Sequence, residues 1–153
     1  MRLDIHRAFP EGRKAMLAFE SAVNAGELDH GLLDLVRTRV SQINGCAFCL
    51  DMHTKDLRAA GETEQRLHTL AAWRDAPFYT APERAALALA EAVTLVAGTE
   101  VPDALIDEAR RHFSDAQIAQ LIYAIGAINV WNRLNVVARP PVGGYVAAQH
   151  QHA

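Results

Sequence analysis

Two cysteines and a histidine stand close together in the first third of the chain, as Cys46, Cys49 and His53. At about 100° per residue of an α-helix, these three side chains share one face, and Cys49 and His53 lie one turn apart. Gly45 permits a tight entry, so we expect Cys46 at a helix N-terminus and Cys49 in its first turn. Unpaired amides there and a neighbouring imidazolium lower the pKa of a thiol, and a second thiol three residues away can form a disulfide with it. The pattern predicts a dithiol redox centre with an adjacent base.

Two other interpretations of this pair remain open at this point. Free cysteines are among the most often buried residues, so both could be core filler. They could also join His53 as three zinc ligands. The sequence offers no second Cys/His pair at the spacing of a zinc finger or ribbon, so His68 or His112 would have to complete such a site through the fold. We therefore expect no metal.

The composition is that of one ordinary globular domain, spanning residues 1–153. Half of the residues are hydrophobic and 22% are charged, which excludes disorder as the main content. Fifteen Lys+Arg against eighteen Asp+Glu provide no basic footprint for nucleic acid or anionic membranes. No uncharged stretch approaches the roughly 18 residues of a membrane span, and no signal-peptide core follows the first charges. We expect an intracellular, cytoplasmic protein that binds neither nucleic acid nor membranes.

The hydrophobic periodicity is helical nearly throughout, and no alternating segment is bounded by hairpin turns. Capping-box patterns beginning at Thr80 and Ser114 mark two helix starts, and Gly45 and Gly98 mark two helix ends. We predict an all-α protein, a compact bundle of about six or seven helices. The expected helices cover about residues 10–23, 31–43, 46–60, 63–73, 81–97, 102–111 and 115–137.

The last of these helices is apolar on more than one face, with its hydrophobic residues spread from Ile118 to Val137. Such a helix is either central in its bundle or buried between subunits. For a chain this small, we expect assembly through helices into a closed symmetric homo-oligomer.

Several stretches of the chain resemble the alkylhydroperoxidase AhpD-like proteins of the carboxymuconolactone decarboxylase superfamily. The signature is carried by residues 36–53 (VRTRVSQINGCAFCLDMH), and residues 72–79 (AWRDAPFY), 82–89 (PERAALAL) and 128–134 (INVWNRL) are similar to the same family. The resemblance covers about residues 10–142, which we take as the core of the domain. Trp131, Asn132 and Arg133 match the family outside its chemical residues, so we interpret them as packing and hydrogen-bonding groups.

The resemblance implies an AhpD-like fold, a trimer or hexamer, and reduction of peroxides through the two cysteines. It assigns Cys49 as the thiol that attacks peroxide and Cys46 as the thiol that resolves the sulfenic acid to a disulfide. His53 and Asp34 would form the proton relay, and a lipoyl-type dithiol or another thiol donor would reduce the disulfide. Helix-end electrostatics alone would instead favour Cys46 as the more acidic and exposed thiol. We follow the family's assignment because His53 lies one turn from Cys49.

Two positions depart from the family's pattern. The relay carboxylate is typically a Glu twelve residues before the first cysteine, and here that residue is Asp34. Its arm is one methylene shorter, so we expect a water to bridge from it to the relay. Some members with clear peroxidase activity carry a His beside the second cysteine, where this chain has Phe48.

The leading hypothesis is therefore an enzyme, a thiol-dependent peroxidase acting on organic or hydrogen peroxides in antioxidant defence. One alternative is a thiol–disulfide exchange protein or redox sensor with little peroxide turnover. Another is a non-redox lyase like the decarboxylase branch of the superfamily. No glycine-rich phosphate loop or dinucleotide fingerprint is present, so we expect no bound cofactor.

Overall fold

Residues 1–147, the part of the chain that the computed structural model describes, contain eight α-helices and one turn of 3₁₀-helix. No strand occurs among these residues, so the all-α prediction is confirmed. The elements are α1 (Ile5–Ala8), α2 (Pro10–Asn24), α3 (His30–Asn44), α4 (Ala47–Ala59), α5 (Glu64–Thr69), η1 (Leu70–Ala72), α6 (Ala81–Thr94), α7 (Asp103–Arg110) and α8 (Asp115–Ala138).

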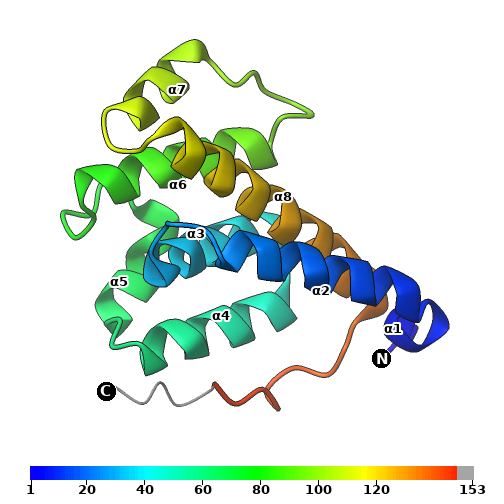
Figure 1. Cartoon of the computed structure of the whole chain (residues 1–153). Helices are drawn as coiled ribbons and strands as arrows, with labels where there is room; N and C mark the ends of the chain where they lie inside the picture. The colour runs from blue at the N-terminus through cyan, green and yellow to red at the C-terminus, as the bar shows by residue number, and fades with distance from the viewer. Residues whose placement is uncertain (148–153) are drawn as a thin grey trace.

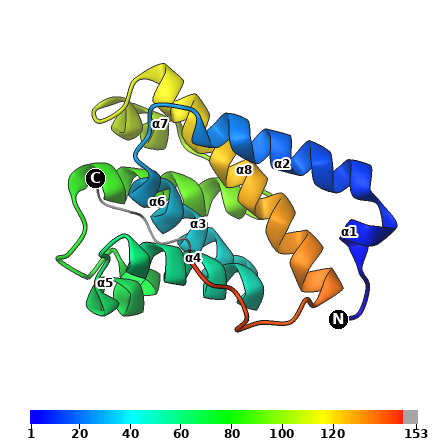
Figure 2. The same ribbon diagram turned by 60° about the horizontal axis from the view of Figure 1, so that its bottom comes forward.

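Helix α3 lies at the centre of the bundle, in contact with α4, α6 and α8. Figure 1 shows α6 above α3 and α4 below it, while α2 and α8 run along the same side of the molecule. In the turned view of Figure 2, the chain leaves the end of α8 and passes along α4. The first residues of α4 thus lie between α3 and the last turns of α8, and this junction is where the two cysteines stand.

Two hydrophobic clusters hold these helices together. The larger one joins α2, α3, α4, α6 and α8 and includes both cysteines. The smaller one packs Trp73, Tyr79 and Leu70 against α3 and α6, through Leu35 and Leu87. Because α3 and α6 contribute side chains to both clusters, they connect the two halves of the core.

Local hydrogen bonds explain where the main helices begin and end. Thr80 and Ser114 form the predicted capping boxes, each pairing reciprocally with the residue three positions later. Gly45 ends α3 in the left-handed region at φ 66°, a conformation that glycine adopts without the steric cost of a side chain. Arg139 ends α8, also in the left-handed region at φ 51° and directly before Pro140.

Two features differ from the elements expected from sequence. Helix α1 was not predicted, because four residues are too few to display a hydrophobic period; Asp4 caps it by accepting a hydrogen bond from the Arg7 amide. Helix α6 ends at Thr94, earlier than the predicted end near residue 97, and the chain continues through turns to Gly98.

The residues after α8 are held along α4 by polar contacts. Lys55 Nζ donates to the carbonyl oxygens of Gly143 at 3.1 Å and Tyr145 at 2.9 Å, and the Tyr145 hydroxyl donates to Asp56 at 2.7 Å. Asp51 accepts from Lys55 and from the Gly143 amide, so its side chain belongs to this contact.

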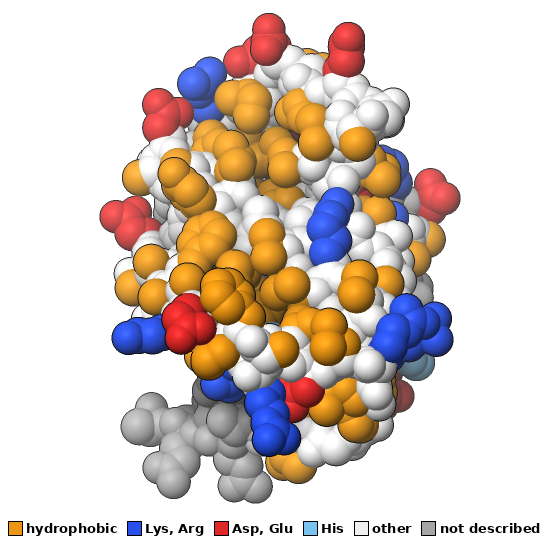
Figure 3. All heavy atoms as spheres, turned by 90° about the vertical axis from the view of Figure 1, so that its right-hand side faces the viewer, with side chains coloured by type: hydrophobic (Ala, Val, Ile, Leu, Met, Phe, Trp, Pro, Cys, Tyr) orange, Lys and Arg blue, Asp and Glu red, His pale blue; other side chains and the backbone are white. Residues whose placement is uncertain are grey.

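Helix α8 also presents apolar side chains to the surface. Tyr123, Val130 and Val137 are spaced seven residues apart and are 62%, 40% and 57% exposed. This spacing places them along one side of the helix, and we call this row the α8 stripe. Figure 3, a view of the side of the molecule on which α8 ends, shows apolar side chains gathered with charged ones mainly around them. Within residues 1–147, no helix combines the length and apolarity needed to cross a bilayer.

Candidate dithiol site

The junction between α3 and α4 positions the two cysteines. After Gly45 ends α3, Cys46 becomes the N-cap of α4, and its Sγ accepts a hydrogen bond from the Cys49 amide at 3.4 Å. Cys46 thus lies at the helix start and Cys49 in the first turn, as the spacing predicts. Both are free thiols and each is only 1% exposed. Because both thiols are buried, the pKa of each depends more on the groups that contact its sulfur than on the end of the helix.

The two thiols have opposite acidities. Hydrogen bonding from the Cys46 thiol lowers the pKa of Cys49 to about 6, despite burial, and Asn135, Asn132 and His53 add to the effect. Asn135 Nδ2 lies 3.5 Å from Cys49 Sγ. The same thiol–thiol contact and burial raise the pKa of Cys46. Helix-end electrostatics alone, which would make Cys46 the more acidic and exposed thiol, is therefore the wrong guide here.

His53 lies on the next turn of α4, and its ring is buried between α4 and α3. Its Nδ1 is 3.4 Å from Oδ1 of Asp34, within ion-pair distance but without the alignment of a hydrogen bond. The shorter arm of aspartate therefore reaches the imidazole directly. We expected a water between Asp34 and His53 or Cys46; at His53 the packing of α3 against α4 already brings the carboxylate within ion-pair distance of the imidazole.

Asp34 is also bound by a buried arginine from its own helix. Arg37 Nη1 donates to Asp34 Oδ1 at 3.0 Å. Burial alone would raise the pKa of Asp34, but His53 and Arg37 together lower it below its ordinary value. Arg37 further bonds Glu20 and, at 2.6 Å, the side-chain oxygen of Asn24. The place of Arg37 could not be predicted from sequence, because Glu20 and Asn24 come from α2 and meet it only through the packing of the two helices.

A row of asparagines from α8 forms the polar wall behind the dithiol. Asn132 is fully buried, donates to Ser41 Oγ at 3.0 Å and accepts from Asn44 at 2.9 Å. Asn44 also reaches Asn129 at 3.0 Å, and Asn135 reaches Cys49. Our interpretation of Asn132 as a hydrogen-bonding group fits these contacts, but its place beside the thiols was missed. Three asparagines at three-residue spacing in an otherwise apolar helix were the available signal.

Other groups considered from sequence lie outside this cluster. Phe48, between the cysteines, is half-buried against the larger hydrophobic cluster. Among residues 1–147, no three His, Cys, Asp or Glu side chains converge in a geometry that could hold a metal ion.

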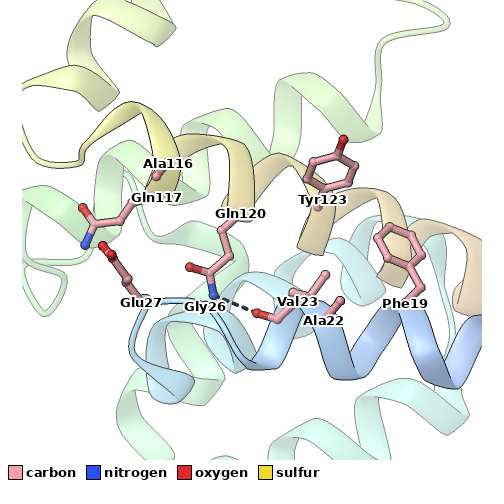
Figure 4. A pocket seen from close by; sticks show the side chains of 9 residues that line it. All are labelled: Phe19, Ala22, Val23, Gly26, Glu27, Ala116, Gln117, Gln120 and Tyr123. Atoms are coloured by element: carbon pink, nitrogen blue, oxygen red, sulfur yellow. Dashed lines mark hydrogen bonds between the residues drawn. The ribbon is translucent and has the colours of Figure 1, made fainter.

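A hollow of about 410 Å³ lies elsewhere, between α2 and the first half of α8. Figure 4 shows Phe19 and Tyr123 at one end of it and Glu27 at the other, with the Gln120 amide bonded to the Val23 carbonyl. Neither cysteine lines this hollow, so it is separate from the dithiol.

Comparison with known proteins gives concordant matches in sequence and in structure. The model of the carboxymuconolactone decarboxylase family matches residues 10–92. The uncharacterized protein YdfG of Bacillus subtilis is 42% identical over 135 residues, which cover 88% of this chain and 92% of that protein.

Two solved structures extend the comparison. ATU0492 of Agrobacterium tumefaciens, described as a protein of unknown function and a candidate antioxidant defence protein AhpD, superposes with a TM-score of 0.90 at 43% identity. The match covers 94% of this chain and 99% of ATU0492. The debrominase Bmp8, solved with 2,3,4-tribromopyrrole, has a TM-score of 0.77 at 19% identity, over 88% of this chain and 72% of that one. At that identity, the likeness to Bmp8 concerns the fold alone.

Proposed function

Because this chain belongs to the carboxymuconolactone decarboxylase family and is AhpD-like, we propose that it is a thiol-dependent peroxidase that reduces organic or hydrogen peroxides. The observation that carries the proposal is the difference in acidity between two adjoining thiols. The Cys46 thiol, Asn135 and Asn132 lower the pKa of Cys49, which favours a thiolate there, while the same contact and burial raise the pKa of Cys46 and favour its thiol. A peroxidase of this kind needs one thiolate to attack and one thiol to resolve.

In the proposed cycle, the Cys49 thiolate attacks one oxygen of the peroxide, ROOH. The sulfur–oxygen bond forms as the oxygen–oxygen bond breaks, and the departing alkoxide takes up a proton and leaves as ROH. His53, one turn away on α4, is the group that exchanges this proton, and Asp34 orients its ring. Phe48 has no proton to transfer, so in this proposal His53 takes the step that a histidine beside the second cysteine could otherwise share.

The second half of the cycle uses Cys46. Its thiol attacks the sulfur of the Cys49 sulfenic acid, the two sulfurs join, and hydroxide leaves with the Cys46 proton as water. An external dithiol then reduces this disulfide by thiol–disulfide exchange and is itself oxidised to a disulfide. We propose a lipoyl-type dithiol or another thiol donor for this role. The cycle thus belongs in the cytoplasm, where thiol reductants are maintained.

Single-turnover oxidation by tert-butyl hydroperoxide tests the proposal. We expect the wild type to form an intramolecular disulfide, Cys46→Ser to stop at a sulfenic acid on Cys49, and Cys49→Ser to consume no peroxide. Mass spectrometry of the thiol-blocked products distinguishes the three states. A Cys49→Ser protein that is oxidised at Cys46 as fast as the wild type would reverse the two thiol roles.

A dithiol exchanger is the second candidate, favoured by Asp34 and Phe48, the two positions that depart from the family's pattern. The same set of proteins separates it from a peroxidase. If peroxide leaves the wild type reduced while its preformed disulfide exchanges with dihydrolipoamide, the protein is an exchanger and the peroxidase proposal fails.

We also propose that the chain assembles as a homo-oligomer, a trimer or hexamer, through the α8 stripe. The stripe exposes a row of apolar side chains that a second copy would cover. Sedimentation velocity should give the mass of several chains for the wild type and a lower mass for Val130→Asp. Val146→Asp, at an exposed valine beyond α8, is the matched control and should keep the wild-type mass. Wild-type protein that sediments as a single chain would contradict the proposal.

A further inference from the structure

Arg37 is a buried cation that the proposed cycle leaves without a role. Its side chain is only 5% exposed, and its guanidinium contacts two carboxylates, Asp34 at 3.0 Å and Glu20. Glu20 is itself fixed, because its other oxygen accepts a hydrogen bond from the Trp131 indole at 3.2 Å. A buried charge is costly unless it is paired, so this chain of contacts ties α8 and α2 to the carboxylate on α3.

The contact with Asp34 is made at the oxygen that faces the imidazole. Oδ1 of Asp34 accepts from Arg37 Nη1 and is also the atom that lies 3.4 Å from His53 Nδ1. The guanidinium and the imidazole therefore share one oxygen. A fixed bond to Arg37 holds the short aspartate arm in the orientation that reaches His53, and it offsets part of the carboxylate's charge.

The negative charge of Asp34 matters because only the His53 imidazole separates this carboxylate from Cys49. A negative charge near a thiol disfavours the thiolate, whereas a neutralised one does not. The charged and titratable groups around Asp34 are Glu20 from α2, Arg37 on α3, His53 on α4, and Tyr145 from the segment after α8. Arg37 is the one permanent cation in this group within the described residues.

We propose that Arg37 is a positioning residue for the dithiol site: it holds Oδ1 of Asp34 facing His53 and offsets the negative charge that this carboxylate would otherwise exert on the Cys49 thiolate. The inference rests on the proposed function only for the identity of Cys49 as the reacting thiol. Its test is therefore alkylation of Cys49, which needs a thiolate but no peroxide.

The experiment measures the rate of Cys49 alkylation by iodoacetamide against pH, read at this residue by peptide mass spectrometry. We expect Arg37→Gln to raise the midpoint by about one pH unit, which lowers the rate at pH 6 about fivefold. Arg39→Gln is the matched control. Arg39 lies on the same helix and makes a similar buried pair away from the dithiol, with Glu91 at 2.8 Å. In Arg39→Gln, the midpoint of Cys49 alkylation should therefore equal that of the wild type.

A double-mutant cycle decides whether Arg37 acts through Asp34. In an Asp34→Asn background, Arg37→Gln should move the midpoint by less than a third of its effect in the wild type. The same shift in both backgrounds, or an unchanged midpoint in folded Arg37→Gln, would overturn the proposal. A shift of equal size in Arg39→Gln would do so as well.

Circular dichroism checks that each variant is folded. If Arg37→Gln fails to fold, Arg37→Lys takes its place, because lysine keeps the charge but lacks the fork that spans two carboxylates. We then expect a smaller upward shift that disappears with Asp34→Asn, and a wild-type midpoint would contradict the proposal. Failure of the wild type to react with peroxide would refute the proposed function, while the alkylation cycle would still decide the role of Arg37.

Discussion

Cys49 owes its acidity first to the Cys46 thiol three residues away, and then to asparagines that are distant in sequence. The spacing of Cys46, Cys49 and His53 is visible in the sequence because one helix carries all three. Asn135, which reaches Cys49 from α8, is 86 residues away, and its role depends on how α8 packs against α4. This is why the dithiol and its base could be predicted from sequence, while the asparagines of α8 that further lower the pKa of Cys49 could not.

The lowered pKa of Cys49 leads to a direct prediction. Because its pKa is about 6, the alkylation rate of Cys49 should rise as pH increases through 6 and level off above about pH 7. Cys46, whose pKa is raised, should stay unreactive over this range. Iodoacetamide labelling with peptide mass spectrometry measures both, and protein unfolded in urea is the control, with a midpoint near 8.5. A folded Cys49 midpoint at the unfolded value would contradict the structure.

At the scale of elements, the sequence predicts best where local chemistry decides. The starts of α6 and α8 follow from side chains that bond their own helix amides, and both capping boxes are present. The direct approach of Asp34 to His53 could not be predicted, because it depends on the separation of two helices and not on any local pattern.

Gly45 should be difficult to replace, because it joins α3 to α4 at φ 66°. A Cβ there would meet no atom within 4 Å, so any cost of Gly45→Ala is backbone strain, about 1 kcal/mol of unfolding free energy. Gly98→Ala is the control, because φ at Gly98 is not in the left-handed region and its Cβ would be 3.9 Å from the nearest atom. We expect Gly98→Ala to be neutral or stabilising in urea denaturation. Equal losses at both glycines would argue against strain at Gly45.

For the molecule as a whole, Glu91 on α6 ties the smaller hydrophobic cluster to α3 through Trp73 and Arg39. One of its oxygens accepts from Trp73 Nε1 and from Arg39 Nε, each at 2.8 Å, and the other pairs with Arg74. Burial alone would raise the pKa of Glu91, but these donors lower it below 4.5. Because the folded pKa is the lower one, the carboxylate stabilises the fold fully above about pH 4.5 and loses this effect as pH falls through the folded pKa.

We therefore expect Glu91→Gln to lower the free energy of unfolding by about 1–3 kcal/mol at pH 7 and by clearly less at pH 3. Urea denaturation at the two pH values measures the difference, with both proteins in the same oligomeric state. Glu64→Gln is the control, because Glu64 pairs with Arg58 at the exposed surface and should change stability little at either pH. A loss for Glu91→Gln that is the same at both pH values would exclude the ionic contribution.

The chain has two tryptophans, and each bonds the glutamate of a largely buried arginine–glutamate pair. Trp73 bonds Glu91 in the smaller cluster, while Trp131 bonds Glu20, the partner of Arg37. Indole emission responds to such contacts, so Trp73→Phe would leave a protein whose fluorescence comes from the dithiol side alone, and Trp131→Phe would report the other side. The molecule thus contains its own pair of optical probes, with which oxidation of the thiols and loosening of the distant cluster can be followed separately and without a label.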